Sequence, residues 1–151
     1  MQGSKMHYVV ATGIIHKNGK FLIVKRAPNE IAFPNRWTVP GGKLEAKDYT
    51  GSKKDTPYHW FNVLERLLER EVKEEVGLEI SNIRYLTNLA FIRPDGVPAM
   101  VISMFADHKE GEVKLCKDLT EHAWVALEEA KRYDLIEGIY EQLEEASRHI
   151  R

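Results

Sequence analysis

The chain has little of several features, and each scarcity excludes a class of protein. Cys116 is the single cysteine among 151 residues, which excludes an internal disulfide or a thiolate zinc cluster and fits a reducing compartment. No apolar run approaches the roughly 20 residues of a membrane helix, and the first residues lack a secretory signal pattern. The formal net charge of -1 creates no overall field toward nucleic acid or an anionic membrane. We therefore expect a soluble cytoplasmic protein that holds any anionic ligand locally.

The length of 151 residues suits one ordinary domain. We expect residues 1–5 to be a remnant or disordered and residues 6–151 to form a single domain. Asn18-Gly19 between two β-branched runs predicts a hairpin, and Thr56, Pro57 and Gly77 have the positions of helix start and stop signals. The predicted strands are 7–17, 20–26, 37–39, 82–93, 97–109 and 123–127, and the predicted helices are 57–76 and 134–150. Residues 46–56 are expected to be an exposed loop.

Strands with one helix between them and another after them imply an α/β fold. The two helices are expected to cover the two faces of one mixed β-sheet, because each has an apolar stripe that must be buried. No internal repeat or interdomain linker interrupts this order.

The predicted helix 57–76 carries acids where apolar residues are expected. With Val63 at zero and about 100° per residue, Leu67 and Leu68 fall at about 40° and 140° and define a buried stripe. Glu71 and Glu75 fall at about 80° and 120°, inside that stripe, and Glu74 lies at its edge.

Acids placed in this way are costly unless a cation is present. Carboxylates three and four residues apart repel, and the negative end of the helix dipole adds about 0.3–1 kcal/mol for each. Mg²⁺ removes both penalties, since it prefers oxygen ligands that it shares with water and phosphate. We interpret the acids as a metal site; a solvated helix end is the alternative, and their spacing does not match an EF-hand calcium loop.

A glycine pair lies ahead of this helix in "WTVPGGKLE", residues 37–45. Gly41 and Gly42 allow backbone groups to approach a ligand without interference from a Cβ atom. A tight turn would also explain them, so this segment alone is a weak signal.

Together, these two segments resemble the Nudix hydrolase signature, G-x5-E-x7-R-E-U-x-E-E-x-G-U, where U is aliphatic. "REVKEEVGL", residues 70–78, satisfies every specified position of the second half of the signature. The opening hairpin, "WTVPGG" and "HAWVALEEA" also resemble the usual Nudix frame. The resemblance implies an α/β/α sandwich in which the mixed sheet is flanked by the signature helix and the C-terminal helix.

The chain departs from the signature by 14 additional residues between Gly42 and Arg70. Asp48 follows Gly42 at the interval of the middle glutamate, and Asp55 precedes the helix as that glutamate would. Neither is Glu, so we assign neither a metal role. The insertion is expected either to form a flap over the substrate or to be a tolerated surface loop; "YHW", residues 58–60, is expected to add helical turns.

The resemblance also implies roles for individual residues. Glu71 and Glu75 would bind Mg²⁺, or Mn²⁺, with Glu74 as a further ligand or as a partner of Arg70, and the Gly42 carbonyl would complete the shell. For the general base the candidates are Glu71 on the helix and two acids of the late segment "KDLTEHAW" that would face the metal. These two acids are Asp118 and Glu121.

Substrate contacts are expected from cations and glycines around the signature. Arg26 and Lys43, with Gly41 and Gly42, are placed to meet phosphates. Trp37 and Phe33 would stack on a base, although a core position is an equal alternative for Trp37.

Hydrolysis of a nucleoside diphosphate linked to another group is the implied reaction. A nucleoside triphosphate pyrophosphohydrolase is favoured by the short chain and simple frame. Two alternatives stay open: a nucleoside diphosphate sugar (ADP-ribose-like) pyrophosphatase, and a Nudix-fold nucleotide-binding regulator without turnover. The expected partner is a small nucleotide or nucleotide-sugar, without membrane or nucleic acid, and a homodimer is the common default for small enzymes.

Overall fold

The computed structural model describes residues 5–150 of the chain. Most of the segment 1–5 lies outside the described residues, so its expected disorder and the extent of the domain, 6–151, stay predictions. The elements, in chain order, are β1 (Tyr8–Lys17), β2 (Lys20–Arg26), β3 (Trp37–Thr38), β4 (Gly41–Lys43), α1 (Lys47–Thr50), α2 (Val63–Val76), β5 (Glu79–Ile92), β6 (Pro98–Glu110), β7 (Leu119–Val125), α3 (Leu127–Ala130) and α4 (Ile139–Ser147).

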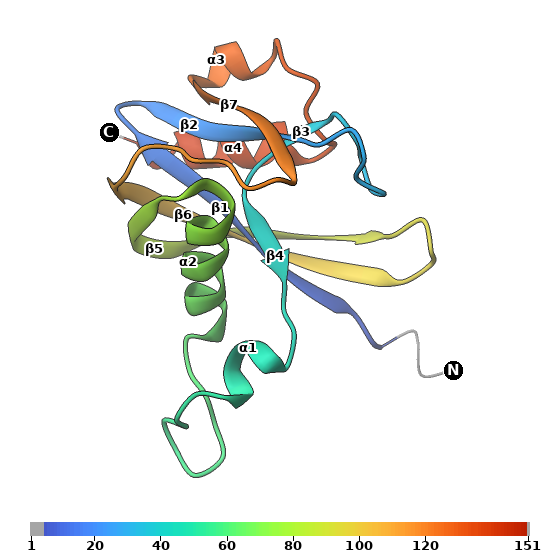
Figure 1. Ribbon diagram of the computed structural model, residues 1–151, viewed down its shortest axis with the longest axis vertical. Coiled ribbons are helices and arrows are strands. Elements are labelled where there is room, and N and C mark those ends of the chain that lie inside the picture. The colour runs from blue at the N-terminus through green and yellow to red at the C-terminus, as the bar shows by residue number, and fades with distance from the viewer. Residues whose placement is uncertain (1–4, 151) are drawn as a thin grey trace.

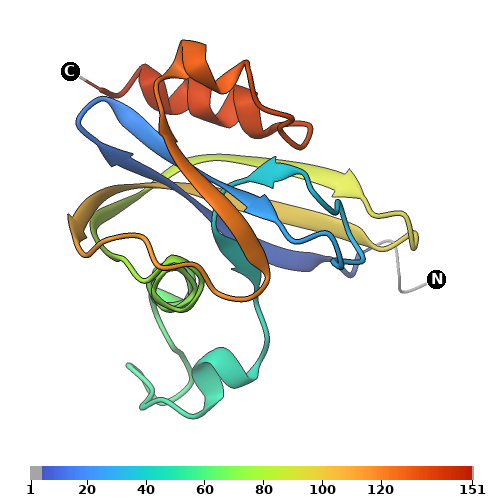
Figure 2. The same ribbon diagram turned by 45° about the horizontal axis from the view of Figure 1, so that its top comes forward.

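A mixed sheet forms the centre of the molecule, as the sequence predicted. The strand order is β3-β2-β1-β6-β5, with β4 paired to β1 and β7 paired to β2. β1 and β6 are parallel, and the other pairs are antiparallel. Figure 2 shows α4 above this sheet and α2 below it, so helices cover both faces.

The hairpin between β1 and β2 follows from its turn residues. Lys17 pairs with Lys20, and Asn18 and Gly19 between them have φ angles of 50° and 78°. Two residues with positive φ form the turn whose twist matches that of the strands. Beyond this end the two strands diverge, because the first half of β1 pairs with β4. The candidate site lies where they separate.

Two apolar cores lie on the two faces of the sheet. On the α4 side, Ile14, Phe21 and Phe105 pack with Leu143. On the α2 side, Leu22, Met104, Leu68 and Val72 pack together. These contacts fix α2 against the sheet, and α2 carries the predicted catalytic acids.

The start of α2 was predicted wrongly. The helix begins at Val63, after Asn62 with a φ of 57°, and not at Pro57. The Thr56 hydroxyl accepts a hydrogen bond from the amide of Tyr58, at 3.2 Å, so it closes a turn and does not cap the helix. Residues 58–60 therefore add no helical turn. The predicted end is confirmed, since Gly77 has a φ of 72° and its amide bonds to the Lys73 carbonyl.

The insertion forms a small lobe and is more than the exposed loop that was predicted. It contains α1 and the segment 51–62, which project from the body of the molecule beyond the start of α2 in Figures 1 and 2. The Trp60 ring lies 5.2 Å from the Tyr49 ring, and its Nε1 donates to the Ser52 carbonyl at 2.9 Å. The segment is therefore ordered by its own contacts.

The C-terminal half follows the predicted order with shifted boundaries. β5 and β6 are joined through Pro94-Asp95-Gly96 as predicted, with a φ of 85° at Gly96. β7 is longer and starts earlier than predicted, and α3 was not predicted. α4 begins at Ile139 and not at residue 134, because Gly138 has a φ of 91°. None of the helices within residues 5–150 is long and apolar enough to cross a membrane.

Candidate active site

Two of the three helix acids lie together on the side of α2 that packs on β4. Glu71 and Glu75 are half-buried, whereas Glu74 is exposed. Val72 and Val76 form the middle of the buried stripe in this part of the helix. The two acids therefore flank the apolar stripe and do not lie inside it as predicted. They face the glycine strand β4.

The glycine pair has a steric role in this contact. A Cβ atom on Gly42 would lie 2.6 Å from the carboxyl carbon of Glu71, and a Cβ atom on Gly41 would overlap the Ala11 carbonyl oxygen. The Gly41 amide also donates to Glu75 Oε2, at 3.4 Å. Glycine at both positions therefore lets the backbone of β4 approach the acid pair directly.

Both acids have raised pKa values, and burial is the main cause. Burial raises the pKa of Glu75 to about 8, and the neighbouring Glu71 carboxylate adds to the rise, while the Gly41 amide and Arg26 oppose it. Burial also raises the pKa of Glu71, against the effect of Arg70. Contact between the two carboxyl groups raises the pKa of Glu75 and lowers that of Glu71. Without a bound cation, Glu75 therefore keeps its proton to higher pH than an exposed glutamate does.

The donor set fits a magnesium ion that is shared with a substrate. Among residues 5–150, no three His, Cys, Asp or Glu side chains gather as a complete metal cage. Mg²⁺ does not need one, because it is commonly bound through one or two carboxylates, several waters and substrate phosphates. Two adjacent, half-buried carboxyl groups whose pKa values are raised by burial match this requirement.

Arg70 connects the insertion to the acid pair. Its guanidinium lies 2.8 Å from Asp48 Oδ1 and 3.3 Å from Glu71 Oε1. The Asp48 side chain is only 3% exposed and also accepts the Glu45 amide. Arg70 is therefore paired with Asp48 and Glu71, and the predicted partner Glu74 does not contact it. Asp55 lies elsewhere in the insertion and pairs with Arg66 at 3.3 Å.

Two predicted phosphate-binding cations border the acid pair. Arg26 and Lys43 line a hollow of about 320 Å³ whose floor includes Glu75, Gly41 and Gly42. The Arg26 side chain is held in place by the Ala32 carbonyl, at 2.8 Å, and by Glu30. The structure thus brings together Arg26, Gly41, Gly42, Lys43, Glu71 and Glu75 from β2, β4 and α2.

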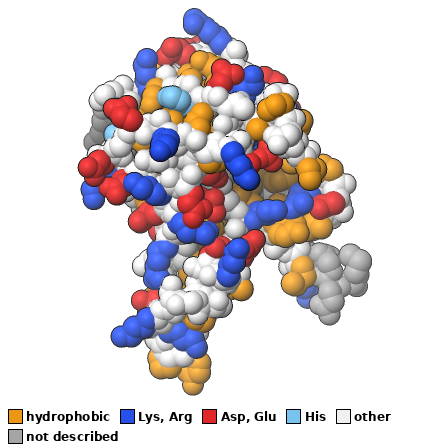
Figure 3. All heavy atoms as spheres, viewed as in Figure 1, with side chains coloured by type: hydrophobic (Ala, Val, Ile, Leu, Met, Phe, Trp, Pro, Cys, Tyr) orange, Lys and Arg blue, Asp and Glu red, His pale blue; other side chains and the backbone are white. Residues whose placement is uncertain are grey.

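Sequence reasoning did not predict an apolar hollow that adjoins this floor, although it named Phe33 in its wall as a stacking residue. It measures about 510 Å³, and it shares Val10, Arg26 and Lys43 with the smaller hollow. Its walls also include Tyr8, Ile31, Phe33, Phe91 and Arg93. Figure 3 shows hydrophobic and cationic side chains gathered beside one another on the right of the view. Tyr8 and Phe91 are separated by 83 residues in the sequence, so only the pairing of β1 and β5 with β6 could reveal this hollow.

Two cations lie over the Tyr8 ring in this hollow. Lys43 Nζ lies 5.3 Å from the centre of its ring, and the Arg93 guanidinium carbon lies 4.4 Å from it. Cations over an aromatic face fix the ring by electrostatic attraction. The ring therefore forms a wall of the apolar hollow next to the two cations.

Three predicted residues lie apart from the acid pair or at its margin. Trp37 is buried on the α4 side against Tyr133, at 4.8 Å between ring centres, so the structure places it in the core. Glu121 pairs with Lys25 at 3.2 Å; it shares a sheet face with Ala123 and Val125, which pack in the α4-side core. Asp118 is exposed just before β7, and its carbonyl accepts the Ala27 amide.

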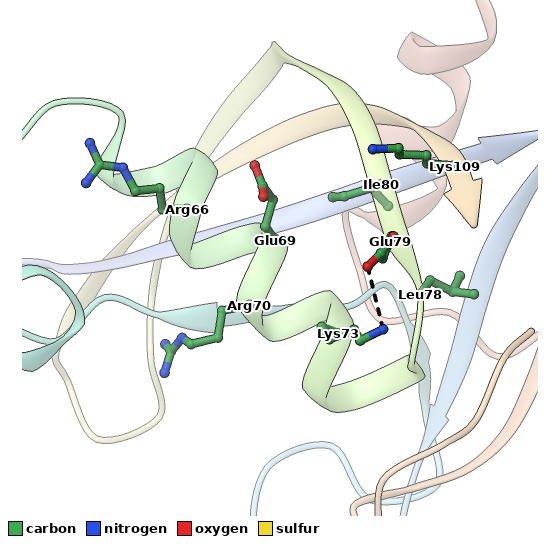
Figure 4. A pocket seen from close by; sticks show the side chains of 8 residues that line it. All are labelled: Arg66, Glu69, Arg70, Lys73, Leu78, Glu79, Ile80 and Lys109. Atoms are coloured by element: carbon green, nitrogen blue, oxygen red, sulfur yellow. Dashed lines mark ion pairs between the residues drawn. The ribbon is translucent and has the colours of Figure 1, made fainter. Parts of the chain in front are cut away.

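A separate hollow of about 490 Å³ lies on the outer side of α2. Its walls include the cations Arg66, Arg70, Lys73 and Lys109 and the acids Glu69 and Glu79. Figure 4 shows that Arg66 and Arg70 extend to one side, away from Lys73 and Lys109, and that Lys73 pairs with Glu79. These cations do not converge, so this hollow lacks the geometry of an anion site.

Comparison with known proteins agrees with this geometry. The chain matches the family model described as the NUDIX domain over residues 63–146. The chain belongs to the Nudix hydrolase family. It is therefore a hydrolase that acts on phosphoric anhydrides, in a family that typically uses a divalent metal ion.

Relatives of this Nudix protein include nucleoside triphosphatase NudI from Escherichia coli strain UMN026, 25% identical over 133 residues, which are 81% of this chain and 84% of the relative. The fold is similar to that of the MutT NUDIX hydrolase from Burkholderia pseudomallei, with a TM-score of 0.74, 22% identity and coverage of 93% and 98% of the two chains. The NUDIX domain of Shewanella oneidensis NrtR, crystallised with ADP ribose, aligns with a TM-score of 0.73 and 15% identity, over 97% and 90% of the chains.

Proposed function

We propose that this Nudix protein is a magnesium-dependent nucleoside triphosphate pyrophosphohydrolase. The observation that carries the proposal is the junction at Arg26 and Lys43, where the hollow that contains Glu75 meets the apolar hollow. A triphosphate placed on the floor would have its base and sugar in the apolar hollow. The name of the E. coli relative, nucleoside triphosphatase, supports the same substrate class.

The size and lining of the larger hollow support one nucleoside. About 510 Å³ lies within the usual range for small-ligand pockets, and its aromatic walls suit a flat base. Tyr8, Phe33 and Phe91 provide these walls.

The reaction adds water across a phosphoric anhydride. The water oxygen forms a bond to phosphorus, the bond to the bridging oxygen breaks, and nucleoside monophosphate and pyrophosphate leave. Glu71 and Glu75 would hold the metal ion, which when bound offsets the negative charge of the anhydride. Arg26 and Lys43 would orient the phosphates, and Arg70 would hold Glu71 in place.

The proton of the attacking water needs a base, for which two acids stay candidates. Glu71 lies in the site, and Asp118 lies at its margin beside Leu119, which lines the floor. Replacement of the base should reduce kcat about 10²- to 10⁴-fold with a smaller effect on KM. We expect this loss in Glu71→Gln or in Asp118→Asn. Glu121→Gln should keep kcat, because its side chain lies on the other sheet face; a comparable loss there would contradict this geometry.

A substrate panel tests the proposal and its alternatives. Nucleoside triphosphates, ADP-ribose and other nucleoside diphosphate sugars are incubated with Mg²⁺ or Mn²⁺ at alkaline pH, and products are separated by chromatography. Monophosphate and pyrophosphate from triphosphates support the proposal. Faster turnover of the sugars would replace it with the nucleotide-sugar alternative, and nucleotide binding without any product would identify a regulator.

A further inference from the structure

The loop between β2 and β3, residues 27–36, forms one wall of the apolar hollow. Its tip, residues 28–33, contributes two apolar side chains to that wall, Ile31 and Phe33. The end of the β5–β6 hairpin provides another wall, and Figures 1 and 2 show the loop and the hairpin end on the same side of the molecule. A movement of the tip would therefore open or narrow the hollow that we assign to the nucleoside.

One side chain holds the tip to the rest of the molecule. Arg26 Nε donates to the Ala32 carbonyl at 2.8 Å, and Arg26 Nη2 lies 3.3 Å from Glu30 Oε2. Within residues 5–150, these are the only hydrogen bonds between the tip and any residue outside the loop. The tip is therefore held by the same arginine that we assign to the substrate phosphates.

The conformation of the tip is unfavourable in two respects. Ile31 is 102% exposed, so its apolar side chain is left in water. Phe33 has a φ of 50°, and a left-handed conformation is uncommon and costly for a bulky residue. Both features favour a second conformation of the tip in which the backbone relaxes and apolar surface is buried.

Glu30 and a substrate phosphate would compete for the same guanidinium. Arg26 lines both hollows of the site, whereas Glu30 lines neither. A phosphate placed on Arg26 competes with the Glu30 carboxylate for the N–H groups of the arginine, and the two anions repel each other. Phosphate binding therefore weakens the contact that holds the tip.

We propose that Glu30 is a positioning residue that gives up Arg26 to the substrate phosphates, so that the tip closes Ile31 over the nucleoside. This inference rests on the proposed function, because it needs phosphates at Arg26 and a nucleoside in the apolar hollow. Ile31 then buries its side chain against the nucleoside, and closure keeps water out of the hollow. Affinity for a nucleotide therefore depends on both Glu30 and Ile31, and affinity for pyrophosphate depends on Glu30 alone.

Calorimetric titration with two ligands separates these two roles. The ligands are inorganic pyrophosphate and an α,β-methylene nucleoside triphosphate, each with Mg²⁺. Glu30→Gln removes the competing charge at nearly constant size, so its Kd for pyrophosphate should be about 3-fold lower than that of the wild type. Ile31→Ser should raise the Kd for the triphosphate analogue about 10-fold and leave that for pyrophosphate unchanged. Glu137 lies 3.2 Å from an arginine outside both hollows, so the matched control Glu137→Gln should change neither Kd.

Hydrogen exchange measured by mass spectrometry reports the closure itself in the wild type. Among the described residues, no backbone acceptor pairs with the amides of Ile31, Ala32 or Phe33, so these amides should exchange fast without a ligand. The triphosphate analogue should slow exchange in the segment 29–33 at least 10-fold. Pyrophosphate should not slow it, because it offers no apolar surface for Ile31.

The outcomes separate this proposal from the proposed function. An unchanged pyrophosphate Kd in Glu30→Gln, an unchanged analogue Kd in Ile31→Ser, or exchange that the bound analogue does not slow would each overturn the loop closure. A wild type that binds neither ligand would overturn both proposals. A wild type that shows the expected affinities and protection but hydrolyses no nucleoside triphosphate would refute the proposed function and leave the loop closure in place.

Discussion

The raised pKa of Glu75 makes the metal-free protein sensitive to pH in a defined direction. Burial raises the pKa of Glu75 from 4.5 to about 8 in the folded state. Below about pH 4.5 the carboxyl is protonated in both states and contributes no pH dependence. Between about 4.5 and 8 the unfolded state loses the proton first, so the free energy of unfolding falls as the pH rises. Above 8 both states are ionised, and the full cost of the buried charge is present.

The size of this effect can be bounded from the two pKa values. At about 1.36 kcal/mol per pKa unit, the difference between 4.5 and about 8 corresponds to at most about 5 kcal/mol. The carboxyl group borders an open hollow, and contact with water reduces this to roughly 2 kcal/mol. For a chain of this length, roughly 2 kcal/mol shifts Tm by about 4–8 °C.

Glu75→Gln removes the charge but keeps the shape. In EDTA at about pH 9 we expect its Tm to exceed that of the wild type by about 4–8 °C, with little difference at about pH 5. Mg²⁺ should raise the Tm of the wild type and leave that of Glu75→Gln unchanged, and the variant should lose turnover. The exposed Glu69→Gln in the same helix is the matched control and should change neither value.

Thermal denaturation followed by circular dichroism, across pH and with or without Mg²⁺, measures all of these values. A Glu75→Gln variant that is no more stable than the wild type in EDTA at alkaline pH would show that Glu75 is not a buried charge. The interpretation of the acid pair as a metal site would then lose its electrostatic basis.

Two further substitution pairs test the site. Gly42→Ala should reduce kcat about 100-fold with a change in stability below about 1 kcal/mol, because its Cβ displaces only the end of the Glu71 side chain. Gly41→Ala places a Cβ against the Ala11 backbone and should mainly lower Tm. The opposite pattern in the two variants would contradict these contacts. Asp48→Asn should lower kcat about 10-fold with KM unchanged, since it releases the arginine that holds Glu71. Asp55→Asn also frees an arginine but should keep kcat, and equal losses in both variants would refute a specific role for Asp48.

Local signals in the sequence predicted the parts of the fold that depend on local geometry. Asn18-Gly19 and Gly77 require positive φ, and both occupy the predicted turn and helix end. Helical periodicity likewise placed Glu71 and Glu75 on the inward side of the helix, although they flank the apolar stripe and do not lie in its middle. The predicted start of α2 was wrong for a local reason too. Thr56 and Pro57 resemble a helix start, but the Thr56 hydroxyl closes a turn and Asn62 adopts a left-handed conformation.

Features that depend on contacts between distant segments were harder to predict. The face of Glu121 follows from the register of β7 against β2, and the alternation Glu121, Ala123, Val125 is the signal that could have indicated it. The sequence alone does not show whether Trp37 stacks on a ligand or packs in the core. Its contact with Tyr133 shows that it packs in the core. Asp48 could be distinguished from Asp55 only through its contact with Arg70.

The lobe formed by α1 and residues 51–62 begins next to Asp48 and ends immediately before α2. The ion pair between Asp48 and Arg70 thus lies between the lobe and the site. No residue of 49–62 lines the hollow that contains Glu75. We therefore expect the lobe to tolerate a longer, shorter or different segment. An affinity tag inserted between residues 51 and 58 should point away from the site and leave turnover unchanged.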